Sequence, residues 1–315
     1  MAESLDIHDW QELLLVAAAI ELDIFRELAQ KPADAGELAR RLDYDSRSVR
    51  IVLAALEDLG HVEKKKGRYR TSAQIRSLAV DQESPDYAPY SILHRRNLIE
   101  RWLTIPAVVR SGKQVERAYT KERRMVFVHS MNDVSRRFAG AIVNRCLRRA
   151  PDARSVIDIG GGPGIYGREF AKHCLKVTIY DRPEVLKITR SELSDVPELN
   201  FASGDFNQKI PAGPFDVAFM SNIFHIYGPE ENLKLLRRVH ASLAPGGIAA
   251  IVDSVRGLSP RAPLFAVTML INTDTGDTWT EDDYLGWLRQ AGFENISIED
   301  VQDNGRQLIL ANKAR

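Results

Sequence analysis

The hydrophobic positions of the first eighty residues follow a helical pattern. Apolar residues recur every three or four positions over 10–29, which predicts a helix that ends before Pro32. Two shorter amphipathic helices follow, and the basic segment 62–71 then predicts a hairpin with its turn at Gly67. Helices followed by a basic hairpin are typical of a winged-helix domain, which we place at residues 1–80.

The pattern changes near residue 150. Residues 81–150 are helical in pattern, rich in arginine and interrupted by prolines, so we expect a helical connecting layer there. Beyond it, short apolar runs rich in β-branched residues alternate with helix-like stretches, which predicts parallel strands covered on both faces. The expected strands are residues 155–159, 176–180, 216–220 and 248–252.

The C-terminal segment has a different pattern from the parallel part. Residues 295–301 and 307–311 alternate as strands around a turn at Asp303, Asn304 and Gly305, which predicts an antiparallel hairpin. The sequence therefore predicts an α/β protein. A Rossmann-like domain at residues 151–315, with a mostly parallel sheet that ends in an antiparallel hairpin, follows an all-α, winged-helix-like region.

Charge and cysteine content exclude several classes of protein. Lys and Arg number 43 and Asp and Glu also number 43, so no net charge favours nucleic acid or a membrane surface as a partner. The two cysteines, Cys146 and Cys174, match no metal-ligand spacing, and we expect no metal. The first ten residues lack a secretory pattern, and no apolar run has the length of a membrane span, which favours a cytoplasmic protein.

The strongest chemical motif joins the first predicted strand to the following helix. Gly160, Gly162 and Gly164 form a glycine-rich turn, which lets a ligand approach the backbone at a helix N-terminus. Ile165 stands where the dinucleotide fingerprint requires a glycine, and Asp158 lies just before the turn. A carboxylate there would repel a pyrophosphate but suits the cationic sulfonium and ammonium groups of S-adenosylmethionine (SAM).

Two further acidic positions extend this candidate cofactor site. Asp181, followed by Arg182, ends the next strand about twenty residues beyond the first glycine, the spacing at which an acid binds ribose hydroxyls. Gly204, Asp205 and Phe206 come after the next run. There the carboxylate can accept from an adenine amino group while the aromatic ring packs on the base.

In this order, and behind a winged-helix-like domain, these motifs together with 215–225 and Pro245-Gly246-Gly247 resemble a known family. It is the class I SAM-dependent small-molecule O-methyltransferases of the plant caffeate and bacterial polyketide type, enzymes of secondary metabolism. The resemblance implies an N-terminal domain that forms an intertwined homodimer and does not bind DNA. It also implies that the connecting layer contributes to the substrate pocket, with Phe127 and Met131 contacting a small aromatic or polyketide-like acceptor.

The resemblance assigns catalytic roles to residues at two further strand ends. The family's general base is a histidine just past the fourth strand, the place that His225 occupies, and a neutral imidazole can accept a hydroxyl proton. Asp253 stands where one of two acids orients that base. Ser221, near the cofactor, occupies a position that is often lysine in plant members.

The sequence departs from the family at the second acid. Thr278 stands where a glutamate is usual, with Asp277 as a possible substitute, and Trp279 replaces an arginine and is expected to contact substrate. Because of these changes, C- or N-methylation and a different SAM-dependent reaction remain alternatives to O-methylation. A DNA-binding regulator that uses Arg47, Arg50 and the basic hairpin is a third, less favoured alternative.

Overall fold

The structure is a computed structural model that describes residues 9–116, 120–173, 175–301 and 305–315. The chain divides into two compact units, residues 1–100 with 119–134 and residues 101–118 with 135–315. We describe each unit separately. The helices of the expected connecting layer, residues 81–150, are divided between the two units.

The first unit consists of helices and one hairpin. Its elements in chain order are α1 (Trp10–Glu21), α2 (Ile24–Gln30), α3 (Ala35–Leu42), α4 (Ser46–Asp58), β1 (Val62–Lys65), β2 (Arg68–Thr71), α5 (Ala73–Ala79), most of α6 (Pro89–Trp102) and most of α8 (Lys121–Ser135). The hairpin pairs Lys65 with Arg68 and turns at Gly67, as expected. The single helix expected over 10–29 is wrong, because Asp23 adopts a left-handed φ of 54° that separates α1 from α2.

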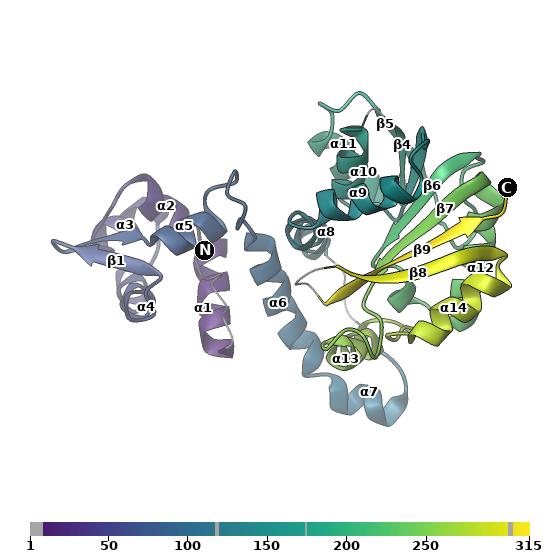
Figure 1. The fold of residues 1–315 in the computed structure, drawn as a ribbon. Coiled ribbons are helices and arrows are strands. Elements are labelled where there is room, and N and C mark those ends of the chain that lie inside the picture. The colour runs from purple at the N-terminus through teal and green to yellow at the C-terminus, as the bar shows by residue number, and fades with distance from the viewer. Residues whose placement is uncertain (1–8, 117–119, 174, 302–304) are drawn as a thin grey trace. The chain divides into compact units, whose positions relative to one another are not determined.

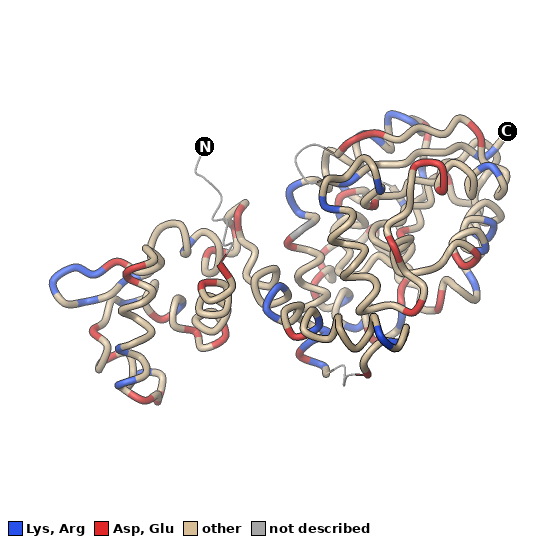
Figure 2. Tube along the Cα trace, turned by 90° about the horizontal axis from the view of Figure 1, so that it is seen from below, with Lys and Arg blue, Asp and Glu red and all other residues tan. Residues whose placement is uncertain are grey.

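Charges of both signs lie on this unit. Figure 2 shows the basic tip of the β1–β2 hairpin close to acidic positions. Arg68 pairs with Glu37 at 2.6 Å and Arg70 pairs with Glu63 at 2.5 Å. Both hairpin arginines therefore have carboxylate partners within their own unit.

The second unit is a three-layer α/β structure. Its elements are α7 (Ile105–Ser111), α9 (Ala139–Arg149), β3 (Ser155–Ile159), α10 (Ile165–Ala171), β4 (Lys176–Asp181), α11 (Pro183–Glu192), β5 (Leu199–Ser203), β6 (Phe215–Ser221), η1 (Phe224–Ile226), α12 (Pro229–Ser242), β7 (Leu243–Asp253), α13 (Ala262–Asn272), α14 (Glu281–Gln290), β8 (Phe293–Val301) and β9 (Arg306–Lys313). The strand order is β5-β4-β3-β6-β7-β9-β8. The expected fold class is confirmed: five parallel strands are extended by the antiparallel strands β9 and β8.

Two apolar layers cover this sheet. Val156 on β3 packs in the layer beneath α9, α10 and α11, whereas its neighbour Ile157 packs in the layer beneath α12 and α14. Figure 1 shows the two sets of helices on opposite sides of the sheet. Both neighbours of β3 are parallel to it, and β4 and β6 continue in opposite directions across the sheet, which makes a topological switch point. Loops at the carboxyl ends of these strands are therefore the expected place for a ligand.

Among the described residues, no helix combines the length and apolar character that crossing a membrane requires.

Candidate active site

The glycine-rich turn lies between β3 and α10. Gly160 and Gly164 adopt left-handed φ values of 65° and 76°. A Cβ atom on Gly160 would lie 2.8 Å from the Ile223 side chain, and one on Gly164 would lie 2.5 Å from Leu193. Both the backbone conformation and the close packing therefore require glycine, and the turn remains narrow enough for a ligand to approach its backbone.

Asp181 closes this turn from the end of β4. Its carboxylate accepts hydrogen bonds from the backbone N–H of Gly162 at 2.9 Å and of Arg182 at 2.7 Å. Burial raises the pKa of Asp181, although the two backbone hydrogen bonds oppose that shift. The second strand-end acid is thus fixed directly against the glycine turn, although the two lie in separate sequence motifs.

Asp158 is the most unusual group in this part of the site. Asp158 is only 1% exposed, and its Oδ2 has no hydrogen-bond partner among the described residues. Burial, together with the nearby charge of Asp181, raises the pKa of Asp158 to about 7. A buried carboxylate with an unpartnered oxygen fits a ligand that brings positive charge or hydrogen-bond donors, as SAM does.

The raised pKa of Asp158 makes the ligand-free protein sensitive to pH. The folded chain holds this proton up to a pH of about 7, whereas an unfolded aspartate loses it near about pH 3.9. Stability therefore falls as the pH rises between these values, because the folded protein must then bury a charge. We expect Asp158→Asn without ligand to be more stable than the wild type at pH 8, by up to about 4 kcal/mol, and similar to it at pH 4.

Urea unfolding at several pH values measures this difference. The exposed Asp195, replaced by asparagine, is the control and should change stability little at any pH. A difference between Asp158→Asn and wild type that stays constant from pH 4 to pH 8 would contradict the prediction.

Residues after β5 border the same turn. The backbone N–H of Gly204 donates to the backbone carbonyl of Asp181 at 3.0 Å, and the carboxylate of Asp205 accepts from the backbone N–H of Asn207 at 2.9 Å. A ring atom of Phe206 lies 3.5 Å from the position that a Cβ on Gly160 would take. The sequence motifs around Asp158, Asp181 and Phe206 are therefore adjacent in the fold.

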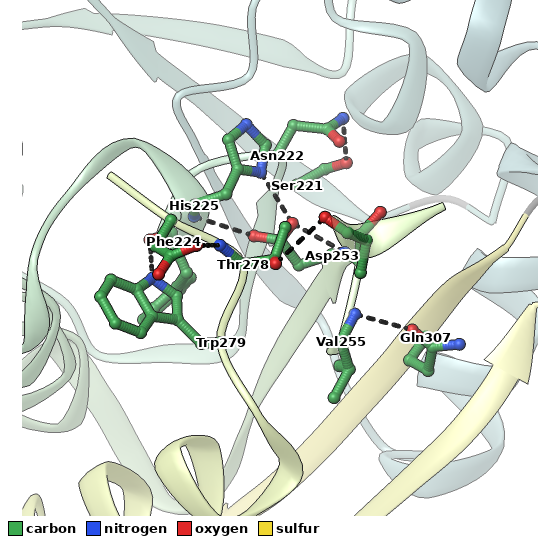
Figure 3. Close-up of polar contacts among 12 residues, drawn as sticks. Ser221, Asn222, Phe224, His225, Asp253, Val255, Thr278, Trp279 and Gln307 are labelled. Atoms are coloured by element: carbon green, nitrogen blue, oxygen red, sulfur yellow. Dashed lines mark hydrogen bonds and ion pairs between the residues drawn. The ribbon is translucent and has the colours of Figure 1, made fainter. Parts of the chain in front are cut away.

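A second polar group lies at the ends of β6 and β7. His225, on η1, is 6% exposed, and its Nδ1 lies 2.7 Å from Oδ1 of Asp253, which is 1% exposed at the end of β7. The backbone N–H of His225 also donates to Oδ2 of Asp253 at 3.2 Å. Figure 3 shows both contacts. The two predicted catalytic residues, 28 positions apart, thus form a buried pair.

The charge state of Asp253 identifies the proton-bearing nitrogen of His225. Burial alone would raise the pKa of Asp253, but the charge and hydrogen bond of His225, together with the backbone N–H of Ser254 and the charge of Arg306, hold that pKa below its ordinary value. An ionised carboxylate can only accept, so Nδ1 of His225 carries the proton in this pair. In the neutral ring Nε2 then has a free lone pair, and no partner for Nε2 is found among the described residues.

At the positions where the sequence departs from the family, neither Thr278 nor Asp277 takes the place of the second acid. The hydroxyl of Thr278 donates to the carbonyl of Ala262 at 3.2 Å and accepts from Nε of Arg256 at 3.2 Å. Asp277 forms an ion pair with Arg256. Neither side chain forms a hydrogen bond or ion pair with His225, so within the described part of the chain Asp253 is the one carboxylate paired with the imidazole.

Two contacts at or next to His225 were not predicted from the sequence. The ring of Phe265 on α13 meets that of His225 edge to face at 4.7 Å between centroids. Asn232 on α12 is fully buried and donates to the carbonyls of Phe224 at 2.9 Å and Tyr227 at 3.1 Å. Asn232 occupies the apolar stripe that continues through Leu235 and Val239, and a polar residue on such a stripe was a signal available in the sequence.

The remaining predicted site residues lie in three places. Ser221 ends β6 and its hydroxyl accepts from the Asn222 side chain at 3.0 Å. The indole N–H of Trp279 donates to the carbonyl of Phe224 at 2.8 Å (Figure 3). Phe127 and Met131 lie on α8 in the first unit. Within the described residues, no group of His, Cys, Asp and Glu side chains is arranged to hold a metal ion.

Known proteins resemble this chain in both sequence and fold. A family model described as an O-methyltransferase domain matches residues 110–294, more than half of the chain. The tetracenomycin polyketide synthesis 8-O-methyl transferase TcmO of Streptomyces glaucescens is 29% identical, over 90% of this chain and 88% of that protein. The 3-hydroxy-5-methyl-1-naphthoate 3-O-methyltransferase of Streptomyces sahachiroi is 28% identical, over 94% of this chain and 90% of that protein.

The fold agrees with this result. Human N-acetylserotonin methyltransferase in complex with SAM has a TM-score of 0.83 to this chain at 21% identity, covering 97% of this chain and 94% of the human chain. The family resemblance predicted from the motifs is confirmed, and O-methylation is favoured over the C- and N-methylation alternatives. This chain therefore belongs to the O-methyltransferase family.

Proposed function

We propose that this SAM-dependent O-methyltransferase uses His225 as the general base that deprotonates a hydroxyl group of a small-molecule acceptor. The observation that carries the proposal is the 2.7 Å contact between Nδ1 of His225 and Oδ1 of Asp253. It commits the proton-bearing nitrogen to Asp253 and leaves Nε2 able to accept a proton.

The residues of this chain then have separate tasks. When bound, SAM supplies an electrophilic methyl group. His225 accepts the hydroxyl proton at Nε2 as the acceptor oxygen becomes nucleophilic, and Asp253 stabilises the resulting imidazolium through Nδ1–H. The buried surroundings of both residues strengthen this charge interaction by excluding water.

We further propose that the glycine turn and its neighbours hold the methyl donor. The cationic end of SAM is assigned to Asp158, its ribose to Asp181 and its adenine to the segment after β5. The proposed cofactor-binding residues are Asp158, Gly160, Gly162, Gly164, Asp181, Arg182, Gly204, Asp205, Phe206 and Ser221. The adjacency of these motifs and the unpartnered Oδ2 of Asp158 support the assignment.

Calorimetric titration with SAM and with S-adenosylhomocysteine tests the donor site. Asp181→Ala removes a carboxylate that can accept from ribose hydroxyls, and the loss of such charge-assisted hydrogen bonds is expected to weaken binding about 10- to 100-fold. Asp195→Ala, at an exposed acid paired with Arg168, should bind both ligands like the wild type. Unchanged affinity in Asp181→Ala would remove Asp181 from the site.

The acceptor is proposed to be an aromatic or polyketide-like molecule with a hydroxyl group. Phe127 and Met131 are its proposed contacts. The names of the related enzymes suggest two first probes, 3-hydroxy-5-methyl-1-naphthoate and N-acetylserotonin. Methyl transfer from radiolabelled SAM to either compound identifies a usable acceptor.

We also propose the larger organisation that the family resemblance implies. Residues 1–80 would form a winged-helix dimerisation domain, 81–150 a helical layer that contributes to the substrate pocket, and 151–315 the catalytic domain of a cytoplasmic homodimer. The carboxylate partners of the hairpin arginines Arg68 and Arg70 support a domain without a nucleic-acid partner. The molar mass in solution tests the dimer.

A further inference from the structure

Two side chains donate to one backbone atom of the turn that carries His225. Phe224 precedes the histidine on η1, and its carbonyl oxygen accepts two hydrogen bonds, from the indole Nε1 of Trp279 at 2.8 Å and from the side-chain amide of Asn232 at 2.9 Å. Figure 3 shows the indole directed at this carbonyl. The position of the imidazole therefore depends on donors that do not touch the ring itself.

Trp279 also contacts the segment that carries the acid. Its backbone carbonyl accepts from the N–H of Arg256 at 2.8 Å, and Arg256 lies three residues beyond Asp253. Thr280, the residue after Trp279, forms a parallel β-bridge with Arg256. One residue thus connects the β7 end, which bears Asp253, to the turn that bears His225.

The indole is itself firmly packed. Its ring meets that of Trp287 edge to face at 5.4 Å between centroids, and it packs against the apolar layer beneath α12 and α14. Trp287 in turn packs against Tyr284 at 5.6 Å between centroids. A packed ring with one N–H group provides both a fixed position and a hydrogen-bond donor.

We propose that Trp279 is a positioning residue that fixes His225 against Asp253, in place of the second acid that Thr278 does not provide. This inference rests on the proposed role of His225. It differs from the substrate contact expected for Trp279, because here the indole acts through the Phe224 carbonyl. Small displacements of a catalytic group are costly, since about 1 Å of misplacement can lower a rate about 100-fold.

Trp279→Phe removes the donor and retains most of the ring, whereas Trp287→Phe changes the neighbouring ring and leaves the donor in place. Nuclear magnetic resonance of ¹⁵N-histidine-labelled protein reports the Nδ1–H proton that His225 shares with Asp253. Its signal is assigned by its absence from His225→Ala. We expect this signal to move upfield or broaden in Trp279→Phe and to stay at its wild-type position in Trp287→Phe.

Kinetics with whichever probe acceptor is methylated supplies the second readout. In Trp279→Phe we expect kcat to fall between about 10- and 100-fold, with the acceptor KM and the SAM affinity unchanged. Replacing Trp279 by its sulfur isostere benzothienylalanine removes the N–H at constant ring size and should have the same effect. This variant replaces Trp279→Phe in the test if the phenylalanine variant folds poorly.

Either of two results would overturn the inference. One is a wild-type Nδ1–H signal in Trp279→Phe and in the isostere. The other is a normal kcat with a raised acceptor KM, which would make Trp279 a substrate contact instead. Failure of the proposed function gives a different result from failure of this inference. If His225 is not the base, His225→Ala keeps its turnover, whether or not the Nδ1–H signal of Trp279→Phe is perturbed.

Discussion

Replacing His225 with alanine is expected to lower turnover by about 10²- to 10⁴-fold, the usual contribution of a positioned general base. The variant loses the imidazole whose Nε2 can accept the hydroxyl proton and whose Nδ1 lies against the buried carboxylate of Asp253. SAM affinity should be unchanged, because His225 is not one of the proposed donor-site residues, which follow β3, β4 and β5 and include Ser221 at the end of β6. Steady-state kinetics and calorimetry measure the two quantities separately.

A matched histidine variant distinguishes the base from a general effect of the substitution. His173 is exposed at the end of α10, so His173→Ala should keep wild-type turnover. If His225→Ala retains more than about a tenth of wild-type turnover, His225 is not the base, because such a loss is smaller than the smallest loss expected on removing a general base. If it loses SAM affinity instead, its role is to support the cofactor site.

Asp253→Asn is expected to reduce turnover by a similar factor, about 10²- to 10⁴-fold, through charge and tautomer rather than loss of the base. Asparagine has the size of aspartate but no charge to stabilise an imidazolium. The carboxylate also accepts the backbone N–H groups of His225 at 3.2 Å and Ser254 at 2.8 Å. An amide NH₂ group cannot accept, so one of these buried donors would lose its partner.

Asp253→Asn should also change the dependence of stability on pH. The pKa of Asp253 lies below its ordinary value in the folded chain, so its stabilising effect is present above the unfolded value of about 3.9 and is lost as the pH falls through the folded value. At neutral pH we expect the variant to be less stable by about 1–3 kcal/mol. The difference should shrink in acid below about pH 4.

Asp216→Asn is the appropriate control for this variant. The carboxylate of Asp216 accepts from the backbone N–H groups of Arg154 and Ser155, both at 2.9 Å, near the amino end of β6. We expect Asp216→Asn to lose stability and keep its turnover. Equal losses of turnover in both aspartate variants would indicate that damage to the fold, and not loss of the pair with His225, lowers the rate.

The adjacency of the two motif groups follows from the strand order of a doubly wound sheet. Asp158, Asp181, His225 and Asp253 were predicted from the ends of apolar runs, and carboxyl ends of parallel strands share one edge of the sheet. Neighbouring strands β6 and β7 pair Ser221 with Val252, which brings the residues that follow them together. Short apolar runs with polar residues at or just beyond their ends therefore contain this information.

Contacts between unlike elements were not predictable in the same way. Phe265 meets His225 from a helix, and Asn232 donates to the turn from another, so both depend on how helices pack on the sheet. The break at Asp23 is local, but it could not be predicted, because the helical spacing of apolar residues continues through this position although its backbone is left-handed. The direction of the Trp279 indole depends on Phe224, 55 positions away.

Single-turnover methyl transfer tests directly whether His225 is the general base. Wild type and His225→Ala, each saturated with radiolabelled SAM, would be mixed with excess acceptor and quenched at increasing times, so that product release does not limit the observed rate. We expect rapid transfer in the wild type and a rate about 10²- to 10⁴-fold lower in the variant with SAM still bound. Equal single-turnover rates would contradict this expectation and exclude His225 as the base.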